Sequence, residues 1–93
     1  MNHVRNCNFQ YVYVLRSLKS GRWYIGCTND IRKRFNENKN NKSTYTKGKG
    51  PFELIYYEAS RNKLDGFARE KCLKTGIGRR FLKNRLKRFL FLT

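Results

Sequence analysis

The N-terminal part of the chain alternates aromatic and β-branched residues with other side chains, a pattern typical of a strand. Phe9–Arg16 (FQYVYVLR) shows this alternation, and Arg22–Gly26 (RWYIG) predicts a second strand after the turn residues Ser17–Gly21. Together these segments predict a β-hairpin. A third strand is predicted over Phe52–Glu58 (FELIYYE), whose dense apolar content favours burial on both faces and therefore a central position in the sheet.

Between the second and third predicted strands, the apolar spacing becomes helical. Ile31 and Phe35 lie four residues apart, on one face of a helix predicted from about Asp30 to Asn38. The stretch Lys39–Gly50 is polar, basic and punctuated by glycine, which predicts a surface loop. Pro51 restricts the residue before it and so prevents a helix from running into the third strand.

The C-terminal third predicts two helices. The first is expected to be capped by Asp65 or by Ser60, and to end at Gly76 and Gly78. The second, Gly78–Leu92, reads as a basic amphipathic helix. The predicted order is therefore β-β-α-β-α-α, without internal repeat or linker. The expected inward stripe of the first of these helices is Leu64, Phe67, Ala68 and Cys72.

Basic residues dominate the charge of the chain. Among 93 residues there are 22 Lys+Arg and 6 Asp+Glu, a formal net charge of +16. Residues 31–50 carry seven basic side chains against one acidic, and residues 61–93 carry eleven against two. Such an excess predicts a polyanionic partner, above all nucleic acid. With 39% hydrophobic residues the chain can still build a small core, so residues 1–93 are expected to form one domain.

Composition also argues against several classes of protein. No apolar run approaches the roughly 20 residues that span a bilayer, and no secretory signal is visible, so a cytoplasmic protein without membrane insertion is expected. Three cysteines without a C-x-x-C pair are expected to be reduced thiols. A single histidine, His3, argues against a Ser-His-Asp triad or a His-rich metal site. The six scattered acids disfavour a two-metal site and leave one metal held by one carboxylate.

Three groups of residues could carry chemistry. Tyr13 and Tyr24 would project together if the hairpin register places them on one face, where two phenols could hold or deprotonate a water; packing within a strand is the alternative. Arg34 could present a fixed guanidinium to a phosphate, or could lie along the edge of the core. Glu70 could be a single oxygen ligand for Mg²⁺, or could pair with Lys74 four residues on.

Taken in order, these residues form the pattern of a known family. Tyr11-Val12-Tyr13, then Tyr24-Ile25-Gly26, then Arg34, then Glu70 in FAREKCLK, resemble the GIY-YIG nuclease family. The closest resemblance is to small stand-alone members similar to the N-terminal domain of the excision-repair incision subunit, and it covers about residues 9 to 88. It implies a small α/β (α+β) domain with a three-stranded antiparallel sheet flanked by helices. It also implies phosphodiester hydrolysis with one divalent metal ion, Mg²⁺ or Mn²⁺.

The resemblance also implies roles for individual residues. Tyr13 corresponds to the tyrosine that positions or deprotonates the attacking water, and Tyr24 to the tyrosine near the scissile phosphate. Arg34 corresponds to the arginine that stabilises the pentacovalent charge. Glu70 corresponds to the metal-binding glutamate, and Asn84 to an amide near the same phosphate.

Asn38 departs from the family pattern and separates two interpretations. Four residues after Arg34 the family usually has His or Tyr, which can relay a proton, whereas an asparagine amide cannot accept one at pH 7. The first interpretation is a structure- or single-strand-selective DNA endonuclease involved in DNA repair. The alternative is a weak or inactive nucleic-acid-binding module on the same fold. A ribosome-associated RNA-binding protein and a membrane-surface role for Gly78–Thr93 are further alternatives.

Contacts to nucleic acid are expected mainly from the predicted loop and the basic helices. Tyr45 in the loop would be available to stack on a base. No recognition helix, zinc finger or dimer zipper is present, so a monomer that reads no long sequence directly is favoured. DNA is the favoured partner, and RNA is possible. The expected binding residues are Arg32, Lys33, Lys42, Ser43, Thr44, Tyr45, Thr46, Lys47, Lys74, Arg79 and Arg80.

Overall fold

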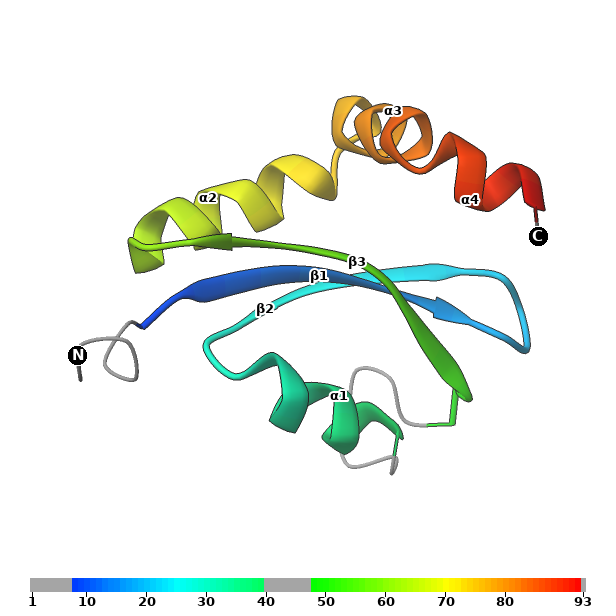
Figure 1. Ribbon diagram of the computed structural model, residues 1–93, viewed down its shortest axis with the longest axis horizontal. Coiled ribbons are helices and arrows are strands. Elements are labelled where there is room, and N and C mark those ends of the chain that lie inside the picture. The colour runs from blue at the N-terminus through cyan, green and yellow to red at the C-terminus, as the bar shows by residue number, and fades with distance from the viewer. Residues whose placement is uncertain (1–7, 40–47, 93) are drawn as a thin grey trace.

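A three-stranded antiparallel sheet with helices on both faces makes up the fold (Figure 1). The computed structural model describes residues 8–39 and 48–92. Figure 1 shows α1 on one face of the sheet and α2 and α3 on the other. The fold class predicted from the sequence is thereby confirmed. The elements are β1 (Gln10–Ser17), β2 (Trp23–Thr28), α1 (Ile31–Lys39), β3 (Phe52–Ser60), α2 (Lys63–Leu73), α3 (Gly76–Arg85) and α4 (Lys87–Leu92).

The strand order is β2-β1-β3, so β1 is the central strand and the predicted central position of Phe52–Glu58 is wrong. β1 is buried along most of its length, whereas most of β3 is only half-buried. The apolar content of β3 reflects packing along one flank of the sheet rather than burial on both faces. Tyr57, for example, is 53% exposed and packs edge-on against Tyr11, with ring centroids 5.9 Å apart.

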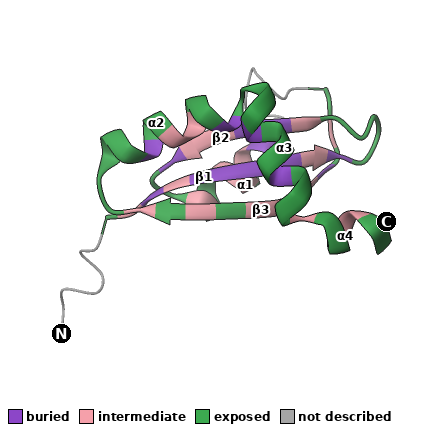
Figure 2. Ribbon diagram, turned by 90° about the horizontal axis from the view of Figure 1, so that it is seen from above, coloured by how far each residue is buried: buried purple, intermediate pink, exposed green. Residues whose placement is uncertain are grey.

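Alternation along β1 divides the core into two clusters. Val12 and Val14 face α2 and α3, while Tyr13 and Leu15 face α1. Figure 2 shows the buried positions concentrated on the central strand. We call the face of the sheet that packs against α1 the α1 face. The first cluster consists of Val12, Val14, Ile25, Leu73 and Leu82; the second consists of Tyr13, Leu15, Tyr24 and Phe52, with Ile31, Phe35 and Leu54 packed against it.

Helix α1 agrees with the prediction to within one residue, whereas the predicted start of α2 is wrong. Asp30 caps α1, since its Oδ1 accepts from the Lys33 backbone N–H at 3.1 Å. At α2 the cap is Asn62, whose Oδ1 accepts from the Leu64 backbone N–H at 2.8 Å, rather than Asp65 or Ser60.

The predicted inward stripe of α2 is also wrong. Leu64 is 71% exposed and Phe67, Ala68 and Cys72 are exposed as well, whereas Gly66 and Leu73 are buried. The helix approaches the sheet through its glycine, because a Cβ at Gly66 would overlap the side chain of Gln10. A close approach through a small residue turns the larger apolar residues away from the sheet, and apolar spacing alone does not reveal it.

The C-terminal helices are divided differently from the prediction. α2 ends at Leu73, and Gly76 begins α3 instead of ending the preceding helix. Gly78 lies inside α3 against the backbone of Cys72 and Leu73, where an added Cβ would overlap main-chain atoms. The predicted helix Gly78–Leu92 is interrupted at Leu86, so the helical segment forms α3 and α4. None of the helices within residues 8–39 and 48–92 is long and apolar enough to cross a membrane.

Candidate active site

Tyr13 and Tyr24 lie on the same face of the hairpin, so the register meets the condition that the sequence left open. The register pairs Tyr13 with Gly26 and Leu15 with Tyr24, so the two tyrosines are diagonal neighbours on adjacent strands. Both belong to the cluster on the α1 face and are 7% and 8% exposed. The Tyr24 ring packs edge-on against Phe52, with centroids 5.6 Å apart and planes at 86°. Packing therefore holds both phenols in place.

Gly26 makes room for the ring of Tyr13. A Cβ built at Gly26 would overlap the Oη and Cζ atoms of Tyr13. The phenol therefore lies directly across β2 at the position of the glycine. This is the close approach that a glycine inside a strand commonly marks.

The Arg34 guanidinium lies near the Tyr13 phenol and forms an ion pair with Glu37 on its own helix. A side-chain hydrogen bond with Tyr13 and the neighbouring Glu37 carboxylate raise the pKa of Arg34 above its ordinary value. The Nε of Arg34 lies 3.2 Å from Oε1 of Glu37. The Arg34 side chain is still 40% exposed. The site thus holds a permanently charged guanidinium that is oriented by a phenol and open to a ligand.

Asn38 is built into the helix that carries Arg34. It is 2% exposed, and its Nδ2 donates to the backbone oxygen of Arg34 at 3.0 Å. The amide thus supports the turn of α1 from which the guanidinium projects. This contact gives Asn38 a structural function, distinct from the proton relay that His or Tyr could provide at this position.

Glu70 approaches β2 from α2. Its Oε2 lies 3.1 Å from Nζ of Lys74, the i,i+4 pair that the sequence offered as the alternative to metal binding. Burial raises the pKa of the Cys27 thiol on β2, and the Glu70 carboxylate raises it further, whereas Arg34 and Lys74 lower it. The Cys27 thiol is therefore within electrostatic range of Glu70 on α2 and of Arg34 on α1, although these two helices cover opposite faces of the sheet (Figure 1).

The carboxylates differ in whether they are available to bind a metal ion. Among residues 8–39 and 48–92, no three His, Cys, Asp or Glu side chains gather as a ready-made metal site. A Mg²⁺ ion typically retains several waters and uses one or two carboxylates together with substrate phosphate oxygens. The single carboxylate of Glu70 fits that donor set. The remaining acids are Glu37 beside Arg34, Glu53 paired with Arg16, Glu58 paired with Arg69, Asp30 capping α1, and Asp65 exposed in the first turn of α2.

The remaining residues predicted from the sequence are more dispersed. Arg32 and Lys33 are exposed on α1. Asn84 is exposed on α3 and lines a shallow hollow with Ile77, Arg80 and Phe81, which contains none of the residues of the α1 face. The predicted loop contacts Lys42, Ser43, Thr44, Tyr45, Thr46 and Lys47 lie outside the described residues.

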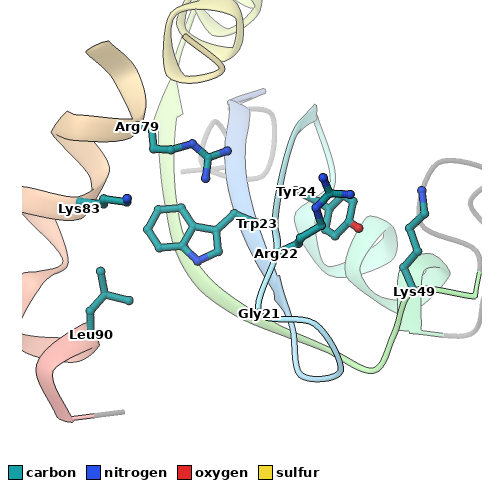
Figure 3. Close-up of a pocket in the computed structure, with 8 residues that line it drawn as sticks. All are labelled: Gly21, Arg22, Trp23, Tyr24, Lys49, Arg79, Lys83 and Leu90. Atoms are coloured by element: carbon teal, nitrogen blue, oxygen red, sulfur yellow. The ribbon is translucent and has the colours of Figure 1, made fainter. Parts of the chain in front are cut away.

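A basic cleft of about 820 Å³ opens at the start of β2, opposite α3 and α4 (Figure 3). We call it the β2 cleft. Tyr24 belongs both to this cleft and to the α1 face, so the two are continuous. Of its lining residues, the sequence predicted only Tyr24 and Arg79. The lining residues are Gly21, Arg22, Trp23, Tyr24, Lys49, Arg79, Lys83 and Leu90.

Comparison with known proteins identifies the domain. The family model of the GIY-YIG catalytic domain matches residues 9–88. The chain belongs to the GIY-YIG family. The family identified from the sequence motifs is thereby confirmed, and with it a nuclease-type hydrolase domain that binds nucleic acid. GIY-YIG nucleases generally depend on a divalent metal ion.

Small bacterial proteins of the GIY-YIG family are similar to this chain. The UPF0213 protein CPE1444 of Clostridium perfringens is 38% identical over 65 residues, which are 69% of each chain. The UPF0213 protein YazA of Bacillus subtilis is 35% identical over 68 residues, 72% of this chain and 68% of that protein. The solution NMR structure of the UPF0213 protein BH0048 from Bacillus halodurans superimposes with a TM-score of 0.52 at 30% identity, covering 82% of this chain and 83% of that one. These names specify no substrate.

Proposed function

We propose that the protein is a metal-dependent endonuclease that hydrolyses DNA phosphodiester bonds, with a preference for single-stranded or branched DNA. The observation that carries the proposal is that Tyr13 and Tyr24 lie side by side on the α1 face, with the Arg34 guanidinium of α1 near enough to Tyr13 for the phenol to raise the pKa of the arginine. A net charge of +16 supports a polyanionic substrate. A role in repair, a cytoplasmic location and a monomeric state are predictions that accompany this function.

Three residues at the α1 face have roles in the proposed reaction: Arg34, Tyr13 and Tyr24. Arg34 binds the non-bridging oxygens of the scissile phosphate and stabilises the charge that develops on them. Tyr13 orients the attacking water through its hydroxyl group, and Tyr24 binds the phosphate from the adjacent strand. The water oxygen bonds to phosphorus and releases a proton to solvent, the bond from phosphorus to one ester oxygen breaks, and that departing oxygen takes up a proton from solvent.

Glu70 is the proposed ligand for Mg²⁺ or Mn²⁺. A bound ion would supply Lewis-acid polarisation of a phosphate oxygen. The carboxylate has the hard oxygen donors that this ion prefers, and its present partner is an ammonium group at 3.1 Å, a cation in the place that a metal ion could take. Lys74 would then be released to the phosphate backbone.

A second candidate function is nucleic-acid binding with slow or absent cleavage. Asn38 supports it, because the buried amide already donates to the Arg34 carbonyl and cannot accept a proton from water. The variant Asn38→His separates the two functions. A gain of cleavage in that variant, with no cleavage in the wild type, would establish the binding module. Equal cleavage in both would establish the nuclease without help from position 38.

The proposal is tested with labelled single-stranded, duplex and flap DNA and with RNA, each incubated with Mg²⁺, Mn²⁺ or EDTA. We expect metal-dependent products, predominantly from single-stranded or flap DNA. Glu70→Gln should slow cleavage by about a hundredfold or more while DNA affinity changes less than about threefold. Asp65→Asn removes one charge from the same helix and should cleave like the wild type. Full activity of Glu70→Gln, or no cleavage by either the wild type or Asn38→His, would refute the proposal.

A further inference from the structure

The β2 cleft has the chemistry of a nucleotide site beyond the residues that the proposed reaction uses. Among the described residues, its walls carry four cations and no carboxylate. Arg22 and Lys49 come from the loops that flank β2 and β3, and Arg79 and Lys83 come from α3. A cavity with this charge attracts an anion, and about 820 Å³ lies in the range of ligand pockets.

The apolar part of the cleft fits a base. Trp23 is half-buried at the start of β2, and Leu90 of α4 lies across the cleft from it. Figure 3 shows the side chains of Arg79 and Lys83 extending from α3 toward the Trp23 indole. The Arg79 guanidinium carbon lies 5.8 Å from the indole centroid. A phosphate bound by Arg79 would therefore place its base within reach of an aromatic surface.

The β2 cleft and the α1 face meet at the edge strand β2. Trp23 and Tyr24 are consecutive residues of β2, so their side chains point to opposite faces of the sheet. β2 is an edge strand, so no neighbouring strand separates the two faces there. The Lys49 ammonium lies 5.6 Å from the Tyr24 ring centroid and extends the positive surface between them. A flexible polynucleotide can pass around this edge from Tyr24 to Trp23.

We infer that the β2 cleft binds an unpaired nucleotide flanking the scissile phosphate, with its base stacked on Trp23 and its phosphate held by Arg79 and Lys83. This inference rests on the proposed function and deepens it, because it specifies single-stranded nucleic acid as the substrate class. A base inside a duplex is already stacked and paired, so it cannot reach Trp23. Duplex DNA would contact the cations only.

Trp23 is the only tryptophan of the chain, so its fluorescence reports stacking directly. The wild-type protein is titrated in EDTA, which keeps the strand intact, with three oligonucleotides of equal length: single-stranded, duplex and abasic single-stranded DNA. The inference predicts saturable quenching by the single strand, and less than about a quarter of that quenching by the other two at equal saturation. Equal quenching by the abasic strand, or binding without quenching, would overturn the stacking site.

Substitutions test the site independently of fluorescence, with binding followed by the anisotropy of a labelled oligonucleotide. Trp23→Ala should weaken single-strand binding by about tenfold and abasic-strand binding by less than twofold, whereas Trp23→Phe should retain most of the affinity. Trp23 also packs against the core, so circular dichroism checks the fold, and Trp23→Phe and the wild-type titration remain informative if Trp23→Ala unfolds. Equal loss for intact and abasic strands would refute stacking.

The cation pair has a matched control on α2. Arg79→Gln with Lys83→Gln should weaken single-strand binding by about tenfold and reduce the salt slope of log K by about 1 to 2. Lys63→Gln with Lys71→Gln removes the same charge outside the cleft and should have less than a third of that effect on log K. Equal effects of the two pairs would overturn the cleft as the phosphate site. Quenching without cleavage in any metal would instead refute only the proposed nuclease.

Discussion

Gly26→Ala should displace the Tyr13 hydroxyl while the domain stays folded. The added methyl group would overlap Oη and Cζ of the Tyr13 ring, whose movement is opposed by the cluster on the α1 face. Overpacking of this kind costs about 1–3 kcal/mol. Replacing glycine by alanine recovers about 0.4–1 kcal/mol through the unfolded chain. The net loss should be about 1 kcal/mol, seen as a fall in Tm of about 4–8 °C in a domain of this size.

The effect on cleavage should be much larger than the effect on stability. A shifted Tyr13 hydroxyl moves away from the position at which it raises the pKa of Arg34 and at which it would orient the attacking water. Misplacement of a reacting group by about 1 Å can cost a hundredfold in rate. Single-turnover cleavage by Gly26→Ala should therefore fall by about a hundredfold, with DNA affinity within about twofold of the wild type.

Gly76→Ala is the matched control, because in the described part of the chain no atom outside the neighbouring residues lies within 4 Å of a Cβ built at Gly76, at the start of α3. Its stability should be unchanged or should rise by less than about 1 kcal/mol, with wild-type cleavage. Thermal unfolding by circular dichroism and single-turnover cleavage are measured on both variants. Wild-type cleavage by folded Gly26→Ala would refute the positioning of Tyr13 by this glycine. A stability loss above about 3 kcal/mol would refute a simple shift of the ring.

Three further perturbations follow from individual contacts. Asn38→Ala should cost about 1–2 kcal/mol in urea unfolding, because it removes the buried bond to the Arg34 carbonyl; an unchanged midpoint would contradict this. Gly78→Ala should cost at least about 2 kcal/mol, since the new methyl group meets the backbone of α2; a loss as small as that of Gly76→Ala would contradict it. Burial and the Glu58 carboxylate raise the pKa of Tyr56, so the folded state holds the proton more tightly. Wild-type stability relative to Tyr56→Phe should therefore decline as the pH rises above about 10, and a constant difference would contradict this.

The sequence predicted those parts of the fold that depend on local spacing. Whether Tyr13 and Tyr24 share a face depended on the hairpin register. Alternation predicted the two strands themselves, and the Asp30 cap with Ile31 and Phe35 located α1. For each of these elements, the repeat of apolar positions and the residues that end the element lie within about ten residues of sequence. These elements therefore required no knowledge of tertiary contacts.

The errors arose where tertiary packing outweighed local pattern. Apolar density suggested that β3 is central, but strand order depends on which partners each strand finds. Gly78 was expected to end a helix and Gly66 carried no prediction, whereas each permits α2 to pack closely, on α3 and on the sheet respectively. The β2 cleft was missed because Trp23 and Arg79 are 56 positions apart in the sequence and meet only in the folded chain.

In the proposed reaction, Arg34 beside Tyr13 stabilises the transition state of DNA cleavage. The most direct test compares the wild type with Arg34→Lys, which keeps the positive charge and loses the planar guanidinium fork. Single-turnover cleavage of labelled single-stranded DNA is measured with saturating protein in Mg²⁺ or Mn²⁺, and binding is measured separately in EDTA. We expect the wild type to cleave the DNA and Arg34→Lys to cleave it at least about a hundredfold more slowly. The DNA affinity of the variant should stay within about twofold of the wild-type affinity. Cleavage by Arg34→Lys at the wild-type rate would contradict this role of Arg34.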